Sequence, residues 1–181
     1  MEKTNLMRTI RVEKVTLNVG AGKDQGKLDK GLKLLNMITS KNPVKTKTTK
    51  RIPGWGLRPG LPIGCKVTVR KEDANKLLKR LLFAVDFIIP QKQFDEHGNV
   101  ALGVSEYVDI EGMEYDPEIG AFGLQICVTL ERPGFRIKKR RKCLTKLNHR
   151  HKITKDEAIE FMKSNFNVKL AEDEWNDHKR S

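Results

Sequence analysis

The residues best suited to chemistry in this chain are cations gathered in one tract, Thr39–Arg70. The tract mixes lysine and arginine with threonine, glycine and proline, and it contains no aspartate or glutamate. Ammonium and guanidinium groups bind phosphate oxygens, and this attraction dominates the affinity of proteins for nucleic acids. Because the tract also carries few bulky apolar side chains for a core, we predict that it is a contact surface for a polyanion.

A row of lysines forms the first part of this tract. Val44–Lys50 alternates lysine with threonine or valine, which predicts a β-strand whose exposed face carries the lysines. Lys45, Lys47 and Lys50, continued by Arg51, would repel one another without a nearby anion. We therefore favour contact with RNA over a face that is only solvated.

A loop forms the middle of the tract, because seven glycines and prolines between residues 52 and 64 break any helix or central strand. Trp55 lies between two glycines in this loop, and Arg58 follows three residues later. A flat ring beside a guanidinium suits packing on a nucleotide or a sugar edge. The alternative is a tryptophan that anchors the core, and we favour the external contact.

Gly20–Lys23 suggests a phosphate loop, but two features argue against nucleotide binding. Leu17 stands where that motif needs a glycine, and Asp24 stands where a serine or threonine would bind the metal. We predict a tight strand-to-helix turn instead, whose amides are still able to touch RNA.

The sequence gives little support for a metal site or a catalytic site. Cys127 and Cys143 with His149–His151 lack the paired C-x-x-C ligands of a zinc site, and their cationic neighbours disfavour a dication. We expect Cys65 and Cys127 to be small core residues on apolar strand faces. The acidic pairs of the chain lie in turns without a histidine partner, so we predict no metal, no cofactor and no enzymatic activity.

The charge of the chain is concentrated in two blocks. Lys41–Arg80 holds 12 lysines and arginines against two acids, and Arg132–Lys152 holds 10 against none. Each block therefore carries a net charge of +10, and since the whole chain carries +13, the rest is acidic. Phosphate backbones select such concentrated patches, so we expect a nucleic-acid partner.

Composition and length bound the remaining possibilities. A chain of 181 residues with 38% hydrophobic and 33% charged residues suggests one domain over residues 1–181, with a core at about residues 8–167. No apolar run approaches the roughly 18 residues that span a bilayer, and the N-terminus shows no secretory signal. The three widely spaced cysteines favour a reducing compartment. We expect a soluble, cytoplasmic protein with no membrane contact.

The elements that must position the basic tract follow from hydrophobic periodicity. A period of two predicts strands at Arg11–Val19, Cys65–Arg70 and Leu124–Leu130, with short strand signals (VALGV and EYVDI) between Val100 and Ile110. A period near 3.6 predicts one helix from Lys27 to about Thr39 and a second, capped by Asp73, to about Ile88 before Pro90. This order predicts a two-layer α+β fold, with helices on one face of a largely antiparallel sheet, in a ferredoxin-like (RRM-like) arrangement.

The C-terminal part adds a basic loop and a helix. Residues 132–152 show almost no apolar periodicity, so we expect a long, mobile loop that a partner orders. Thr154 and Glu157 form a capping box that opens a last helix through Met162. The tail, Val168–Ser181, is predicted to fray.

The sequence resembles one known family. Ile38–Lys47, Arg58–Arg70, Val19–Gly22, the turn Phe94–Asn99 and Leu102–Val104 are similar in a single register to the large-subunit ribosomal protein L5 family, over about Arg11–Phe166. The run Glu131–Phe135 and the basic loop after it resemble the archaeal or eukaryotic branch. Trp55 stands where many bacterial members carry phenylalanine.

The resemblance implies a structural protein that binds 5S ribosomal RNA and attaches it to the large-subunit RNA in the central protuberance. It further implies that a glycine-rich loop approaches the transfer RNA in the peptidyl site, and that a small-subunit head protein is reached across the subunit interface. Neighbouring proteins of the central protuberance are further partners. A free RNA chaperone, or another RNA-binding module outside the ribosome, is the alternative.

The residues that we expect to contact RNA fall into two sets. The predicted ribosomal RNA contacts come from the strands and the basic loop: Asn18, Lys41, Lys45, Thr46, Lys47, Thr49, Lys50, Lys66, Arg70, Arg136, Lys138, Lys139, Arg140 and Arg141. The predicted transfer RNA contacts come from the glycine-rich loop: Arg51, Trp55, Gly56, Leu57, Arg58 and Gly60.

Overall fold

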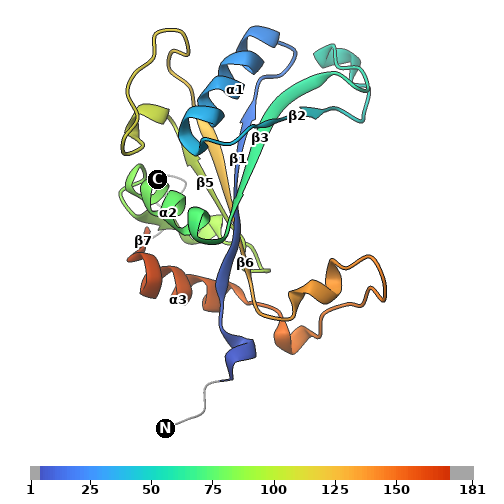
Figure 1. The fold of residues 1–181 in the computed structure, drawn as a ribbon, viewed down its shortest axis with the longest axis vertical. Helices are drawn as coiled ribbons and strands as arrows, with labels where there is room; N and C mark the ends of the chain where they lie inside the picture. The colour runs from blue at the N-terminus through green and yellow to red at the C-terminus, as the bar shows by residue number, and fades with distance from the viewer. Residues whose placement is uncertain (1–4, 172–181) are drawn as a thin grey trace, which may run out of the picture.

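A computed structural model describes residues 5–171 and centres on a five-stranded sheet (Figure 1). The strand order is β2-β3-β1-β6-β5, and every pair of neighbours is antiparallel. The strands are β1 (Arg11–Gly20), β2 (Val44–Lys47), β3 (Pro62–Arg70), β5 (Val100–Val104) and β6 (Leu124–Glu131). β1 lies at the centre of the sheet, so residues on β1 have strands on both sides.

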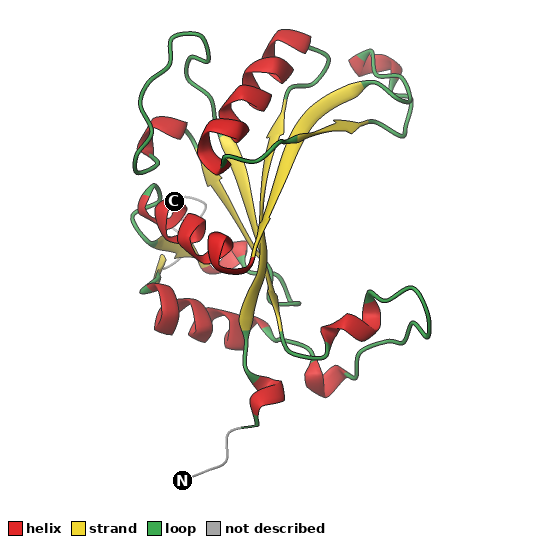
Figure 2. Ribbon diagram, viewed as in Figure 1, coloured by secondary structure: helices red, strands yellow, loops and turns green. Residues whose placement is uncertain are grey.

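Three helices accompany the sheet: α1 (Gln25–Thr39), α2 (Lys71–Phe83) and α3 (Lys155–Phe166). α1 and α2 both pack on β1 and β3, and Figure 2 shows them on the same side of the strands. The order β1-α1-β2-β3-α2-β6, with β1 between β3 and β6, is the split βαβ arrangement of ferredoxin-like folds. The predicted two-layer α+β fold is therefore confirmed.

The alternation in β1 separates the two faces of the sheet. Val15, Leu17 and Val19 are at most 1% exposed and pack beneath the helices with the leucines of α1 and α2. Thr16 and Asn18 point to the opposite face, where they stay partly exposed. One face of the sheet is thus the floor of the core, and the other, over β3, β1 and β6, carries polar side chains.

Two strand boundaries in the basic tract differ from the prediction. β2 ends at Lys47 rather than at Lys50, directly after a bulge between Thr46 and Lys47 that shifts the register. β3 begins at Pro62 rather than at Cys65, within the segment predicted to be a loop. Pro62 is tolerated because it is the first residue of its strand.

The prediction for the second helix was wrong at both ends. α2 begins at Lys71, so Asp73 lies in the first turn and forms an ion pair with Lys41 instead of capping the helix. The helix ends at Phe83, and two residues with positive φ, Asp86 and Phe87, reverse the chain. Pro90 therefore does not stop the helix.

The segment EYVDI is not a strand, which corrects a second prediction. Tyr107–Asp109 is a short 3-10 helix, and the Tyr107 side chain is completely buried. The Tyr107 hydroxyl accepts a hydrogen bond from the backbone N–H of Asp116 at 2.8 Å. The apolar spacing that suggested a strand reflects burial of a turn.

The C-terminal region packs at the far end of the sheet from the tip of the β2–β3 arm (Figure 1). The predicted capping box of α3 is confirmed, since Thr154 and Glu157 bond to each other's backbone N–H groups. The tail was expected to fray from Val168, but Val168 is buried, and β7 (Lys169–Ala171) pairs in parallel with β4 (Ile88–Pro90). The rest of the tail lies outside the described residues.

Among the residues that the structure describes, no helix combines the length and the apolar character needed to cross a membrane.

Candidate nucleic-acid interface

The open face of the sheet is defined by cross-strand rows. In antiparallel pairs, opposite residues point to the same side, so the strand register gives the surface directly. The register places three rows on the side away from α1 and α2: Val44, Lys66, Asn18, Gln125 and Gly103; then Thr68, Thr16, Cys127 and Ala101; then Arg70, Lys14 and Thr129. We name these three rows the open face.

The open face is a flat β surface that carries hydrogen-bonding groups and cations. None of its three rows contains an aspartate or a glutamate. The Asn18 amide donates weakly to Gln125 across the strands, at 3.4 Å. Amides, hydroxyls and lysines on a flat β surface are suited to contact the sugar–phosphate backbone of a nucleic acid.

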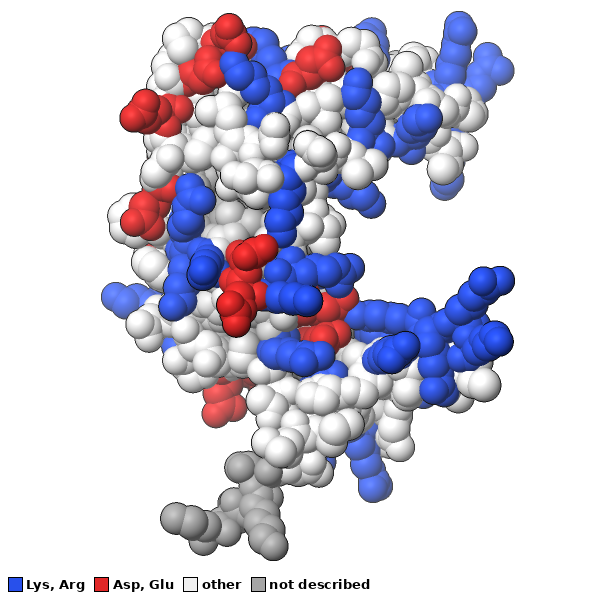
Figure 3. All heavy atoms as spheres, in the orientation of Figure 1, with Lys and Arg blue, Asp and Glu red and all other residues white. Residues whose placement is uncertain are grey.

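Two basic arms flank the open face, and Figure 3 shows the hollow between them. We define the upper arm as residues 44–62 and the lower arm as residues 132–152; Figure 1 shows them in teal and orange. In Figure 3, lysines and arginines gather on both arms beside the hollow, whereas acidic residues gather mainly over the helix side. The basic block of residues 132–152 and the five lysines and arginines of the upper arm therefore lie on either side of one concave surface, whereas most of the other cations of the Lys41–Arg80 block lie on β3 and α2.

The lysines of β2 do not form a single row, which corrects the prediction. Lys45 lies opposite the buried Cys65, on the helix side of the sheet, and its ammonium group is 3.7 Å from Asp29 of α1. Thr46 lies opposite Gly64, on the side of the open face. A side chain at Gly64 would collide with the β1 backbone, since its Cβ would be 2.6 Å from the Val19 carbonyl oxygen.

The tip of the upper arm presents Trp55. A short bridge between Ile52 and Leu57 closes the tip, and Leu57 is buried beneath it. Gly60 donates to the Thr48 carbonyl oxygen at 2.8 Å, which fastens the loop to the end of β2. Trp55 is 69% exposed, so the alternative of a core anchor was wrong. Its contact with an external partner stays a prediction.

The lower arm is anchored at its base by Arg132, which is 5% exposed. Its guanidinium donates to the backbone carbonyls of Arg8 and Lys152 and to the carboxylate of Glu157, at 2.7–3.1 Å. These bonds tie both ends of the arm to the N-terminal segment and to α3. The arm also contains two short 3-10 helices, Phe135–Lys138 and His149–His151, which the sequence did not predict.

An ion-pair network joins the lower arm to the sheet. The Glu13 carboxylate pairs with Arg70 of β3 and with Lys139 of the arm, and Lys139 also reaches Glu131. Burial raises the pKa of Glu13, but the hydrogen bonds from Lys139 and Arg70 outweigh this effect and hold the pKa below its ordinary value. Arg70 and Lys139, both predicted RNA contacts, are therefore held by carboxylates in this structure.

Leu57, a predicted transfer RNA contact, is buried, and Lys41 is half-buried. Most of the other predicted RNA residues are exposed, but several have internal partners. Lys41 is paired with Asp73 at 3.0 Å, and Arg140 donates to the Cys143 carbonyl oxygen at 2.7 Å. The Lys138 ammonium group lies 4.7 Å from the centre of the Phe135 ring. The remaining ones lie at or near the surface of the described part of the chain: Lys47, Thr49, Lys50, Arg51, Arg58, Lys66, Arg136 and Arg141.

The prediction missed most of the open face. Thr16, Thr68 and Gln125 are among its central residues. Cys127 was expected in the core, but it is exposed on this face, whereas Cys65 is completely buried. Burial raises the pKa of the Cys65 thiol to about 11. The signal was present in β6, where the larger aliphatic residues alternate with Gln125, Cys127 and Thr129.

Within residues 5–171, no three histidine, cysteine, aspartate or glutamate side chains lie close enough to hold a metal ion.

The turn at Gly20–Lys23 forms hydrogen bonds within the protein, because the Ala21 and Gly22 amides both donate to the Ile63 carbonyl oxygen.

The fold and the concave basic surface are those of an α+β protein suited to bind a polyanion. Comparison with known sequences identifies the protein family. The family profile described as "Ribosomal protein L5" matches residues 5–58, and the profile for the C-terminus of the same ribosomal family matches residues 62–161. The chain belongs to the ribosomal protein L5 family, whose members are structural proteins of the ribosome and not enzymes.

Two similar relatives are archaeal and match along almost their whole length. The large ribosomal subunit protein uL5 of Sulfolobus acidocaldarius is 46% identical, over 94% of this chain and 96% of the relative. The protein of the same name from Nanoarchaeum equitans is 49% identical, over 91% of this chain and 97% of the relative. The resemblance to the archaeal type is thereby confirmed.

Proposed function

We propose that this protein is a structural component of the large ribosomal subunit that grips ribosomal RNA in the hollow between its two arms. The observation that carries the proposal is the placement of two basic arms on either side of the open face, whose three rows contain no aspartate or glutamate. A phosphate backbone that crosses this face is met by cations from both sides, so counterions are released along its whole path. Membership in the family supports the ribosomal setting, since binding of ribosomal RNA is typical of its members.

The finer proposal divides the surface between partners. The open face and the lower arm bind 5S ribosomal RNA and join it to the large-subunit RNA. The loop of the upper arm, residues 51–62, presents Trp55 and Arg58 to transfer RNA in the peptidyl site. The remaining proposed partners are a small-subunit head protein and neighbouring proteins of the central protuberance. Residues 8–167 act as one unit, bound to the ribosome in the cytoplasm.

The three cysteines give a direct test of the open face, because they lie at three informative places. Cys127 is at the centre of the open face, Cys143 is exposed on the lower arm and Cys65 is buried. The full-length protein is treated with N-ethylmaleimide, with and without 5S ribosomal RNA, and each alkylated cysteine is quantified by mass spectrometry. We expect RNA to slow alkylation of Cys127 at least about tenfold, while Cys65 reacts only after unfolding. Unchanged alkylation of Cys127 at saturating RNA would place the RNA elsewhere.

Variants of Trp55 test the role of the upper arm. Trp55→Ala removes an exposed ring and should leave folding and 5S RNA affinity intact. Positioning of transfer RNA on ribosomes that carry the variant should be impaired. Loss of 5S RNA binding would instead assign the tip to ribosomal RNA.

A free RNA chaperone is the alternative function, because the same arms would serve it. Sedimentation of a cell lysate separates the two, since a ribosomal component sediments with large subunits and a free chaperone remains near the top of the gradient.

A further inference from the structure

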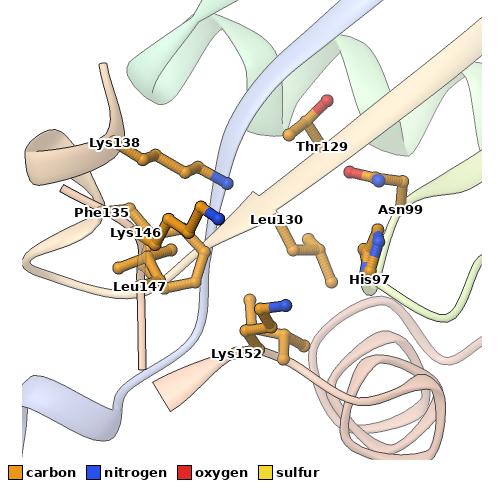
Figure 4. Close-up of a pocket in the computed structure, with 10 residues that line it drawn as sticks. His97, Asn99, Thr129, Leu130, Phe135, Lys138, Lys146, Leu147 and Lys152 are labelled. Atoms are coloured by element: carbon orange, nitrogen blue, oxygen red, sulfur yellow. The ribbon is translucent and has the colours of Figure 1, made fainter. Parts of the chain in front are cut away.

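A cavity of about 420 Å³ lies where the open face meets the lower arm. Thr129, the end of the third row of the open face, lines it on one side, and residues of the lower arm line it on the other. Figure 4 shows Lys138, Lys146 and Lys152 with their ammonium groups toward this space, and His97 and Asn99 across from them. We name it the arm-base pocket, and its volume is in the range of pockets that hold small ligands.

The walls of the arm-base pocket combine two kinds of chemistry. Leu130, Phe135, Leu147 and Ile153 supply apolar walls. Lys138, Lys146 and Lys152 supply positive charge, and no aspartate or glutamate lines the pocket. Among the described residues, none of these three lysines forms an ion pair with a carboxylate, and Lys138 instead lies over the Phe135 ring. Their charge is therefore available to an anion.

The far wall of the pocket is held in place by a close backbone approach. Gly98 has a φ of +76°, and a Cβ at that position would be 2.6 Å from Ile153 Cγ2. The turn that carries His97 and Asn99 therefore packs closely against the base of the arm. The Asn99 amide nitrogen donates to Asp95 at 3.1 Å, which leaves the amide oxygen as an acceptor toward the pocket.

We propose that the arm-base pocket takes one unstacked nucleotide of the bound RNA. Its base enters between the apolar walls, its phosphate is held by the lysines, and the Asn99 oxygen accepts from a base N–H. Proteins recognise RNA through such splayed bases, which have no partner in a helix. The inference rests on the proposed RNA binding, because the mouth of the pocket adjoins the open face over which the RNA backbone passes.

A pair of matched double variants tests the pocket. Lys146→Gln with Lys152→Gln removes two charges that line it, and Lys142→Gln with Arg150→Gln removes two charges from the same arm outside it. We expect the first pair to weaken 5S RNA affinity about tenfold more than the second. Equal losses would show that only the net charge of the arm matters and would overturn the proposal. Leu147→Trp, which fills the pocket without changing charge, should also weaken binding at an unchanged melting temperature.

Ultraviolet crosslinking of 5S RNA to the full-length protein locates the base. We expect crosslinked peptides that contain Leu147 or His97, lost in the Leu147→Trp variant. If the wild-type protein binds the RNA but crosslinks form only elsewhere, the pocket proposal fails and the proposed function stands. If the wild-type protein binds no ribosomal RNA, the proposed function fails as well.

Equilibrium dialysis with UMP and ribose 5-phosphate separates a nucleotide of RNA from other anions. We expect UMP to bind weakly, at least about threefold better than ribose 5-phosphate, and to be displaced by 5S RNA. Equal binding of the two would reduce the pocket to a phosphate site. UMP that is not displaced by bound RNA would make it a site for free nucleotides. Either result would overturn the proposal.

Discussion

Glu13 shows how a single carboxylate organises this basic protein. Its side chain is 9% exposed and bonds at once to Arg70 of the sheet and Lys139 of the lower arm. Without Glu13, two cations would face each other at the base of the hollow. At the residue scale, the interface is therefore a balance between cations held for RNA and the few acids that position them.

Replacing Glu13 tests this balance. The folded-state pKa of Glu13 lies below its unfolded value, so its pairing stabilises the protein above the unfolded pKa, and this stabilisation is lost as the pH falls through the folded pKa. Glu13→Gln should lower the free energy of unfolding by about 1–2 kcal/mol at pH 7. Urea unfolding of both proteins at pH 7 and pH 3 checks this, with a smaller difference expected at pH 3. An equal difference at both pH values would contradict the ion-pair role.

Lys66 and Lys45 make a matched pair for RNA binding. They occupy neighbouring strands, but Lys66 lies on the open face and Lys45 lies on the helix side beside Asp29. Lys66→Gln should reduce the slope of log affinity against log salt by about 1, and Lys45→Gln should reduce it less. Fluorescence anisotropy with labelled 5S RNA at several salt concentrations measures both slopes. Equal effects would extend the interface to the other side of β2.

The elements of this fold divide into a rigid sheet and two arms that extend from it. The upper arm continues the β2–β3 hairpin, so backbone hydrogen bonds hold it. The lower arm has no strand partner among the described residues and depends on Arg132 at its base and on the Glu13 network. At the scale of elements, the lower arm is thus the one that side-chain changes detach most easily.

The Arg132 anchor gives a prediction for the lower arm. Arg132→Met removes four hydrogen bonds and leaves three backbone carbonyls and Glu157 without this partner, so we expect a loss of about 2–3 kcal/mol in the free energy of unfolding. Thr154→Ala, which removes only the cap of α3, should cost about 1 kcal/mol and serves as the control. Chemical denaturation measures both losses, and trypsin should cleave the arm faster in the Arg132 variant. Unchanged cleavage would show that the arm is held by other contacts.

The charge of the whole molecule is unevenly distributed. In the view of Figure 3, lysines and arginines lie on both arms beside the hollow, and the acidic residues gather mainly over the helix layer. Such a field orients the protein before contact, because a polyanion is attracted most strongly toward the hollow. The net charge of +13 thus acts through its distribution.

The salt dependence of RNA binding tests how many phosphates the whole molecule contacts. If about 6–10 phosphates are neutralised, the affinity for 5S RNA should fall by about 10³–10⁵ between 50 and 200 mM salt. Filter binding or anisotropy over this range measures the slope. A slope that corresponds to one or two contacts would limit the RNA to a single arm.

Local patterns in the sequence were sufficient for most of the fold. Alternation identified β1 and β6, the leucine spacing identified α1 and α2, and the capping box placed α3, since each pattern depends on burial of one side of one element. The errors arose where local signals compete. The second helix begins two residues before Asp73, which therefore lies in its first turn instead of capping it, and the spacing around Tyr107 reflected a buried turn.

The sequence by itself determined that this protein is basic in two blocks, has an α+β fold and resembles a ribosomal family, because charge, period and motif are properties of the linear chain. Only the tertiary structure decided which residues share a surface. The strand register placed Cys127 and Thr68 beside Thr16, turned Lys45 away from them, and brought Lys138 and Lys146 of the lower arm opposite His97. Register and arm placement depend on contacts between residues far apart in the chain, which no local pattern records.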